Sequence, residues 1–186
     1  IHRTCKVFVS CGIFFNKTFD YTTKSCNLPS KSVVFYTNMQ TTHKKTAHYH
    51  LPGLFEFYEL YKIFLPLYRE HPEYFYDWCD IASIYGSPED CLWGGGRTGF
   101  GTADANDVLD LMNEYKISPR FTFSNSLLRP EHLTDKKCNR LCKLFCDSKV
   151  SVGVIIHSDL LLEYLKNQFP QFYFVSSTTK VLTDFC

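Results

Sequence analysis

Four short apolar runs divide the second half of the chain, and each ends in a polar or glycine-rich loop. They span residues 91–93, 120–123, 153–156 and 172–175, and the first three are followed by a segment with the helical period. Strands that alternate with helices of ten or more residues are typical of a parallel sheet with crossover helices. The pattern therefore predicts an α/β fold in which residues 91–186 form four parallel strand–helix units.

Three helices are expected between these runs, at residues 104–115, 133–146 and 160–169. Each starts beside residues of the type that cap helices by accepting hydrogen bonds from free backbone N–H groups. The candidate caps are Asp104 for the first helix, Thr134 or Asp135 for the second, and Ser158 with Asp159 for the third.

Aromatic residues dominate the segment before the first predicted strand. Residues 54–68 carry apolar side chains at helical spacing, and Pro66 is expected to end or kink this helix. Residues 73–84 form a second aromatic-rich stretch that is expected to be helical. The wide aromatic face of residues 54–68 either packs across one end of the sheet, which is the favoured interpretation, or docks on a partner or a membrane surface. Residues 48–90 are thus expected to be a helical segment that packs on the barrel.

Residues 1–47 differ from the rest, because a Lys-, Thr- and Ser-rich loop separates two short apolar runs. We interpret them as a leader or extension, with residues 41–47 as a linker. His48 and His50, two residues apart, are assigned to the same linker, and their spacing is attributed to chance.

The number of units limits the architecture. A complete (β/α)8 barrel needs about 250 residues and eight units, whereas this chain has 186 residues and four predicted units. The alternatives are half of a TIM-like barrel, a small open parallel sheet, or a truncated copy of something longer. We favour a partial (β/α)8 barrel from a longer protein. Unpaired edges of such a sheet favour self-association.

Composition and charge exclude several classes of function. The net charge is +1, so bulk electrostatics give no signal for nucleic acid or an anionic membrane. No apolar run approaches the ~20 residues of a membrane span. The nine cysteines are scattered and odd in number, which fits reduced thiols in the cytoplasm better than a disulfide framework.

Polar residues gather where the predicted strands end. In parallel sheets, binding and catalytic groups collect at the carboxyl ends of the strands. We therefore predict a site there for a small polar ligand or a peptide. Its candidate residues are Gly95, Gly96, Arg97, Asn125, His157, Ser177, Thr178 and Lys180.

The glycine-rich loop at residues 94–101 is either a phosphate-binding loop or a loop that needs positive φ angles. It lacks both the spacing of the dinucleotide-binding fingerprint and the Lys-Ser/Thr of a Walker loop. Arg97 favours the first interpretation, because a guanidinium binds a carboxylate or phosphate with two hydrogen bonds.

His157 is the candidate catalytic residue, as a general acid or base. It is alternatively a ligand or a hydrogen-bonded structural residue. Ser158 and Asp159 follow it directly, and consecutive residues of a strand point in opposite directions, so the three do not form a triad.

Three cysteines follow one another at intervals of four residues, at Cys138, Cys142 and Cys146. Iron–sulfur clusters use closely spaced cysteines, but this interval places the thiols in one stripe of a helix. Free cysteine behaves as a small buried hydrophobic residue. We therefore predict that the stripe packs in the core, and no metal site or cofactor is evident.

The four units together resemble the collagenase-like peptidase family. Four segments carry the resemblance, namely Leu92-Trp-Gly-Gly95 with Phe100 and Ala105-Asn106, then residues 121–128, 154–170 and 174–179. They cover roughly residues 91–182 in the family's order. The resemblance implies the N-terminal half of a (β/α)8-like barrel.

Relatives in that family include peptidases and proteins for oxygen-independent hydroxylation of RNA or quinone precursors, some with a cysteine-bound iron–sulfur cluster. The resemblance thus implies a peptidase-like hydrolase, or a modifying enzyme whose cluster would be held by the longer parent. Three departures put catalysis in doubt: the arginine after Phe100 is absent, Thr179 replaces a Gln, and His157 stands near the family's strand-end Gln or Asp. The competing hypothesis is a non-catalytic half-barrel that binds a partner through its open edge and residues 55–76.

Overall fold

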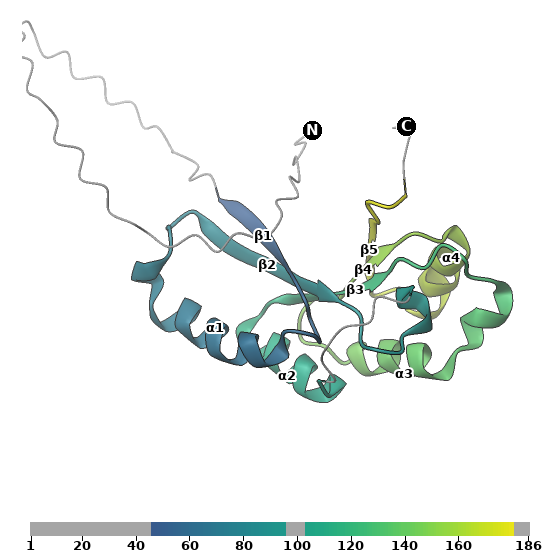
Figure 1. Cartoon of the computed structure of the whole chain (residues 1–186), viewed down its shortest axis with the longest axis horizontal. Helices are drawn as coiled ribbons and strands as arrows, with labels where there is room; N and C mark the ends of the chain where they lie inside the picture. The colour runs from purple at the N-terminus through teal and green to yellow at the C-terminus, as the bar shows by residue number, and fades with distance from the viewer. Residues whose placement is uncertain (1–45, 96–102, 181–186) are drawn as a thin grey trace, which may run out of the picture.

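The computed structural model describes residues 46–95 and 103–180, which fold as alternating strands and helices (Figure 1). Three short 3₁₀ helices, η1 (Pro72–Tyr74), η2 (Leu92–Gly94) and η3 (Pro130–Thr134), lie in the connections. The strands and α-helices are, in order, β1 (Ala47–Pro52), α1 (Tyr58–Glu70), β2 (Cys79–Gly86), α2 (Ala105–Tyr115), β3 (Ser118–Phe123), α3 (Lys136–Phe145), β4 (Gly153–Ile156), α4 (Asp159–Gln168) and β5 (Tyr173–Ser176).

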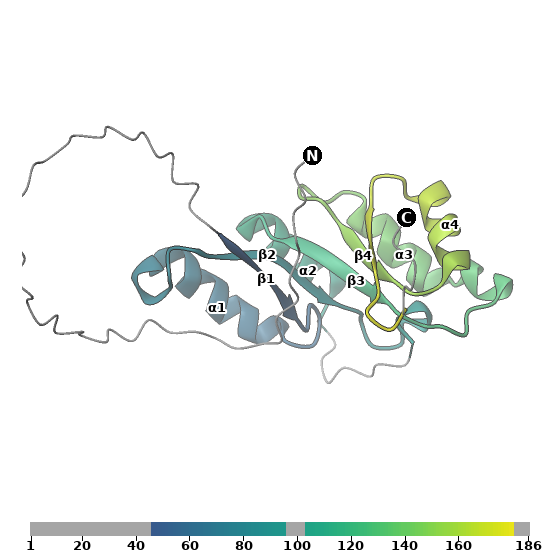
Figure 2. The ribbon, with the colours of Figure 1, turned by 90° about the horizontal axis from the view of Figure 1, so that it is seen from above.

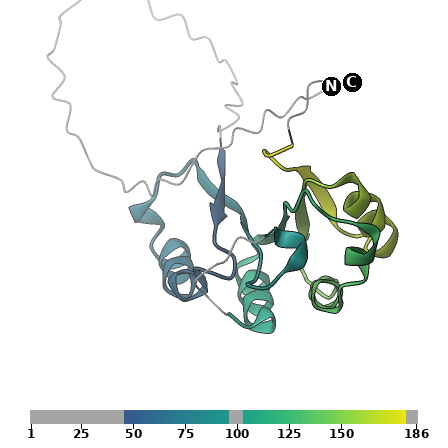
Figure 3. The ribbon, with the colours of Figure 1, turned by 45° about the vertical axis from the view of Figure 1, so that its right-hand side comes forward.

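The five strands form one all-parallel sheet in the order β1-β2-β3-β4-β5. Because parallel crossovers share one hand, neighbours that follow each other in sequence place all their helices on the same side. Figures 1 and 3 show the four helices on that side. Figure 2 looks onto the opposite side, where the described part of the chain places no helix over the strands. We call this uncovered side the open face.

The predicted α/β class with a parallel sheet is confirmed, but its first strands lie elsewhere. Residues 79–84, part of the helix expected at 73–84, instead lie in β2. Ile81 and Ile84 both pack toward the helices, although they are three residues apart, because the pairing with β1 is irregular between Tyr49 and His50. Apolar residues three apart imitate a helical period, which explains the error.

The segment at residues 91–93 was expected to be the first strand, but Leu92 and Trp93 lie in η2 and Cys91 immediately precedes it. The short helix buries Trp93 completely and leaves Leu92 exposed. The Trp93 Nε1–H donates to the carbonyl of His132 at 2.8 Å, which fixes the indole under η3. An apolar run of three residues is too short to distinguish a strand from a helical turn.

His48 and His50 lie in β1 rather than in a linker, and each contacts β2. His48 Nδ1 lies 2.6 Å from Asp80 Oδ2, and His50 Nδ1 lies 2.7 Å from Ser83 Oγ. The helical segment expected over residues 48–90 therefore contains two strands of the sheet, β1 and β2.

The helices α2, α3 and α4 begin at the predicted caps. Asp104 accepts from the N–H of Asn106 at 2.8 Å, and Asp135 accepts from that of Cys138 at 2.8 Å. Ser158 accepts from the N–H of Leu161 at 3.4 Å. Each cap satisfies a backbone N–H that the first turn of a helix leaves free.

Helix α1 begins later than expected and does not end at its proline. Its start is delayed to Tyr58 because Leu54 and Phe55 enter the core in the loop after β1. Pro66 lies within the helix, which continues to Glu70. No helix in the described ranges is long and apolar enough to cross a membrane.

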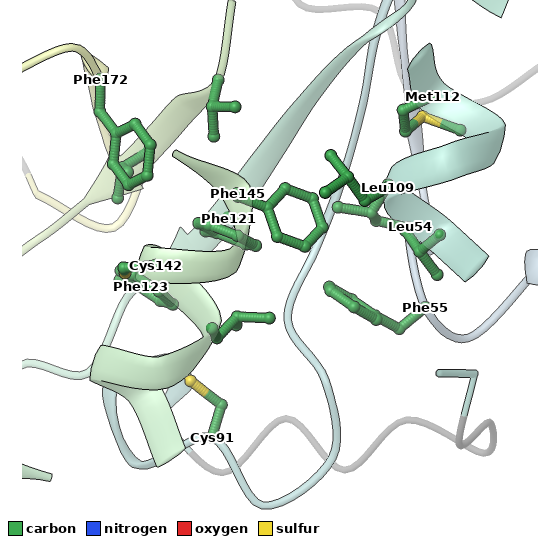
Figure 4. Packing of buried hydrophobic residues seen from close by; sticks show 14 of the residues in the cluster. Leu54, Phe55, Cys91, Leu109, Met112, Phe121, Phe123, Cys142, Phe145 and Phe172 are labelled. Carbon is green, nitrogen blue, oxygen red and sulfur yellow. The ribbon is translucent and has the colours of Figure 1, made fainter. Parts of the chain in front are cut away.

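The core lies between the sheet and the helices, and aromatic rings fill its centre (Figure 4). Phe121 of β3 is fully buried, and its ring centre lies 4.8 Å from that of Phe145 and 5.2 Å from that of Phe123. Burial of one such side chain contributes about 1.5–3 kcal/mol. Cys138 and Cys142 are buried here as predicted, while Cys146 is half-buried.

Candidate functional site

The open face carries polar side chains from β3 and β5, with a glycine of β4 between them. Phe121 and Phe123 point into the core, so the alternation of a strand turns Arg120 and Thr122 to the open face. Arg120 lies beside Gly153 of β4, which in turn lies beside Tyr173 of β5. These positions form one row across the face.

Arg120 is the central charged residue of this row. It is only 5% exposed, its Nε–H donates to the hydroxyl of Tyr173 at 2.6 Å, and its guanidinium carbon lies 5.3 Å from the ring centre. Among the described residues, no carboxylate lies within ion-pair distance of it. A buried charge without a counter-charge is costly, so this position favours an incoming anion.

From the Tyr173 hydroxyl, hydrogen bonds lead on to Ser118 and to the carbonyl of Ser151. Ser118 Oγ–H donates to the carbonyl of Ser151 at 2.7 Å, so its lone pairs are available to the Tyr173 hydroxyl at 2.6 Å. Tyr173 then donates to Ser118 and accepts from Arg120. The chain of bonds orients the tyrosine and leaves the terminal nitrogens of the guanidinium available to a ligand.

Gly153 lets this contact form across an intervening strand. A Cβ at Gly153 would lie 2.5 Å from the Cζ of Tyr173, closer than any normal contact. The tyrosine ring therefore lies directly over Gly153 on its way to Arg120. A larger residue in this position would displace the ring.

At the carboxyl edge of the sheet, the structure brings two predicted residues, His157 and Ser177, close to one another through Thr179. His157 Nδ1 lies 2.9 Å from Thr179 Oγ1, which lies 2.8 Å from Ser177 Oγ. Backbone hydrogen bonds continue the sheet pairing past the strand ends. The N–H of His157 donates to the carbonyl of Phe123 at 3.3 Å, and the N–H of Ser177 donates to that of Ile156 at 2.8 Å. Strand alternation thus places His157 and Ser177 on the open face with Arg120.

Lys180 lies next to this group, and its charge is partnered. Its Nζ forms an ion pair with the carboxylate of Asp159 in the first turn of α4. Asp159 is therefore the partner of a lysine, and Ser158 is the cap of that helix. Thr178, which follows Ser177 in the loop after β5, is exposed.

Asn125 and Gly95 have a structural role in the described residues. The Asn125 side chain donates to the carbonyl of Leu92 and accepts from the N–H of Leu127, both at 2.9 Å. Gly95 has φ +77°, and a Cβ there would lie 3.0 Å from the Asn125 backbone. The amide anchors η2 to the loop after β3. Two further predicted residues, Gly96 and Arg97, lie outside the described residues.

Sequence reasoning missed Arg120, Thr122 and Tyr173. Within the described ranges, Thr122 Oγ1 is the buried side-chain polar atom without a hydrogen-bond partner. Thr122 lines a cavity of about 120 Å³ at the ends of β1, β2 and β3, together with Tyr85 and Ser87. The available signal was the alternation of polar and aromatic residues within 120–123, a run that was interpreted as apolar.

The described residues contain no group of three His, Cys, Asp or Glu side chains that could hold a metal ion. The iron–sulfur cluster implied for a longer parent stays a prediction. No family model, curated protein or solved structure matched the chain. The resemblance to collagenase-like peptidases therefore also stays a prediction.

Proposed function

We propose that this chain binds a polar ligand with an anionic group, on the open face and at the carboxyl ends of its strands. The observation that carries the proposal is the guanidinium of Arg120, which is buried without a carboxylate partner among the described residues. Proteins place a charge in such an environment at a cost in stability. A ligand carboxylate or phosphate would supply the missing counter-charge.

The spacing of polar groups supports an extended ligand. His157 follows Gly153, the neighbour of Arg120, by four residues, which corresponds to about 13 Å along a strand. A short peptide with its carboxylate at Arg120 would reach His157 and Ser177. Gly95, Asn125, Thr178 and Lys180, with Gly96 and Arg97, remain the proposed rim of this site.

The proposed architecture is a partial (β/α)8 barrel. The consecutive strand order and the placement of all four described helices on one face support it, since a barrel keeps its helices outside. In that arrangement the open face would be the barrel interior. A peptidase-like hydrolase or an iron–sulfur-dependent modifying enzyme would then use His157 as a candidate acid or base, with Nδ1 oriented by Thr179.

A second candidate function is a non-catalytic module that associates through its surface. Leu60 and Ile63 of α1 are 52% and 73% exposed, and Phe57 is exposed beside them. The unpaired outer edges of β1 and β5 in the described sheet would add backbone groups for such an association.

Binding of two matched peptides tests the proposal. Tetraglycine and its C-terminal amide differ in the carboxylate, and isothermal titration calorimetry measures each with the wild type and with Arg120→Met and His157→Gln. We expect the acid to bind the wild type at least tenfold more tightly than the amide, and Arg120→Met to remove the difference. Equal binding of both peptides, or no binding of either, would overturn the proposed function. Concentration-dependent dimerisation without peptide binding would favour the second candidate.

A further inference from the structure

Two buried cysteines on the helix side of the sheet lie in contact with each other. Cys91, just before η2, and Cys138, in the first turn of α3, are 9% and 1% exposed, and their Sγ atoms are 3.4 Å apart. Figure 4 shows Cys91 next to α3, with its sulfur directed toward that helix. The pair lies on the side of the sheet opposite the open face, and neither cysteine belongs to the proposed ligand site.

A cavity gives small molecules a route to both thiols. It has a volume of about 420 Å³ and lies between the start of α2, the start of α3 and the loop after β2. Both thiols line this cavity, Cys91 and Cys138, together with the polar side chains of Lys137, Arg140 and Asn106. Two basic side chains thus accompany the thiols, with Asp90 paired to Lys137 at 3.5 Å.

The surroundings distinguish the two sulfurs. The hydrogen bond from the Cys138 thiol lowers the pKa of Cys91, and backbone N–H groups of Gly94 and Trp93 add to this against the opposing effect of burial. The same interaction and burial raise the pKa of Cys138, and Asp135 at the α3 cap adds to that effect. Cys91 is thus the sulfur that loses its proton more readily, and the thiolate is the nucleophilic form; Cys138 is the thiol that donates to it.

We propose that Cys91 and Cys138 form a redox-active dithiol that a hydroperoxide converts into a disulfide. The Cys91 thiolate attacks the terminal oxygen of the hydroperoxide, the O–O bond breaks, and the leaving alkoxide or hydroxide takes a proton. Cys91 is then a sulfenic acid. The Cys138 sulfur attacks Cys91, the S–O bond breaks, and water leaves with the Cys138 proton. In total, two thiols are oxidised and one hydroperoxide is reduced to an alcohol or water, with release of one further water.

The geometry needs little adjustment for the second step. A disulfide has its sulfurs about 2.0 Å apart, so the two atoms must approach by about 1.4 Å from their present 3.4 Å. Cys142 lies one turn further along α3, fully buried, and burial raises its pKa. Cys142 therefore stays reduced while Cys91 reacts.

The test treats the full reduced chain with hydrogen peroxide and maps the products by mass spectrometry. We expect the wild type to lose two thiols, to yield a Cys91–Cys138 cross-linked peptide, and to regain both thiols with dithiothreitol. In Cys138→Ser, the reaction stops at a sulfenic acid that dimedone labels on Cys91. In Cys91→Ser, neither product forms, while the control Cys79→Ser behaves as the wild type.

The wild-type measurement alone decides the proposal if a variant fails to fold. A cross-linked peptide that forms in the folded chain and not in urea, where the two cysteines are separated, supports it. Oxidation that distributes over other cysteines, or dimedone labelling on Cys138 without a cross-link, would overturn it.

Discussion

Replacement of Arg120 by methionine should make the free protein more stable and should weaken its binding of tetraglycine. Methionine keeps an unbranched apolar stem and removes the charged guanidinium of this residue, which is 95% buried and lacks a carboxylate partner among the described residues. The Tyr173 hydroxyl keeps its hydrogen bond to Ser118 Oγ at 2.6 Å after the change. The substitution therefore removes an uncompensated charge without leaving a new buried polar group.

The size of the effect follows from opposing contributions. Removal of an ion from water costs several kcal/mol after relaxation of the protein. The hydrogen bond to Tyr173 and the stacking on its ring offset part of this, by about 1.5–3 and 1–2 kcal/mol. We expect a net stabilisation of about 1–3 kcal/mol, or roughly 2–4 °C in Tm for each kcal/mol. Loss of the charge partner of the ligand carboxylate should weaken the binding of tetraglycine by about 2 kcal/mol or more. This corresponds to a roughly 30-fold increase in Kd.

Arg69→Met is the matched control for thermal unfolding followed by circular dichroism. The Arg69 guanidinium carbon lies 4.2 Å from the ring centre of Tyr115, so it also stacks on a tyrosine. It is half-exposed and paired with Glu114 at 3.2 Å, so its loss should cost no more than about 1 kcal/mol. If Arg120→Met lowers the free energy of unfolding more than Arg69→Met does, and tetraglycine binds unchanged, Arg120 is structural and the reasoning fails.

Three further predictions concern the fold around the site. Gly153→Ala should displace the Tyr173 ring and weaken the binding of tetraglycine as strongly as Arg120→Met does. Calorimetry that shows wild-type affinity for tetraglycine in this variant would contradict the prediction. Burial tends to raise the pKa of Asp135, but the backbone N–H groups at the start of α3, with that of Cys138 at 2.8 Å, and the charge of Lys137 together lower it below its ordinary value. The stability that the carboxylate adds is therefore complete above about pH 4 and lost as the pH falls through the lowered pKa. Urea unfolding should show wild type and Asp135→Asn converging at pH 2.5 and differing at pH 6; a constant gap would refute it. Phe121→Ala should lower the free energy of unfolding by about 3–5 kcal/mol, against less than 0.5 for the exposed control Leu127→Ala; similar losses would argue against this core.

Local signals were sufficient for the helices that follow a clear cap. Asp104, Asp135 and Ser158 each precede a segment with apolar residues at helical spacing, and each cap depends on backbone groups two or three residues away. The strands at 120–123 and 153–156 were also predictable, because their apolar runs are short and bounded by polar loops. These features depend only on neighbours in sequence, so a single chain is enough to read them.

The strand β2 was not predictable in this way, because its apolar spacing depends on another segment. The irregular pairing with β1 between Tyr49 and His50 lets Ile81 and Ile84 face the same side. Nothing within residues 79–86 indicates such an irregularity. The same dependence hid β1, whose pairing partner was assigned to a helix.

The open face depends even more on pairing between distant segments. Alternation within residues 120–123 turns Arg120 away from the two phenylalanines, which the sequence alone could indicate. Whether that arginine meets a carboxylate or a tyrosine depends on the register of β3 with β4 and of β4 with β5. The two registers bring together residues that are 53 positions apart in the sequence. That register brings Gly153 between Arg120 and Tyr173, so the ring can cross β4 and the guanidinium is held without a counter-charge. An uncompensated charge is a property of the assembled sheet, and the sheet had to be assembled before it pointed to an anionic ligand.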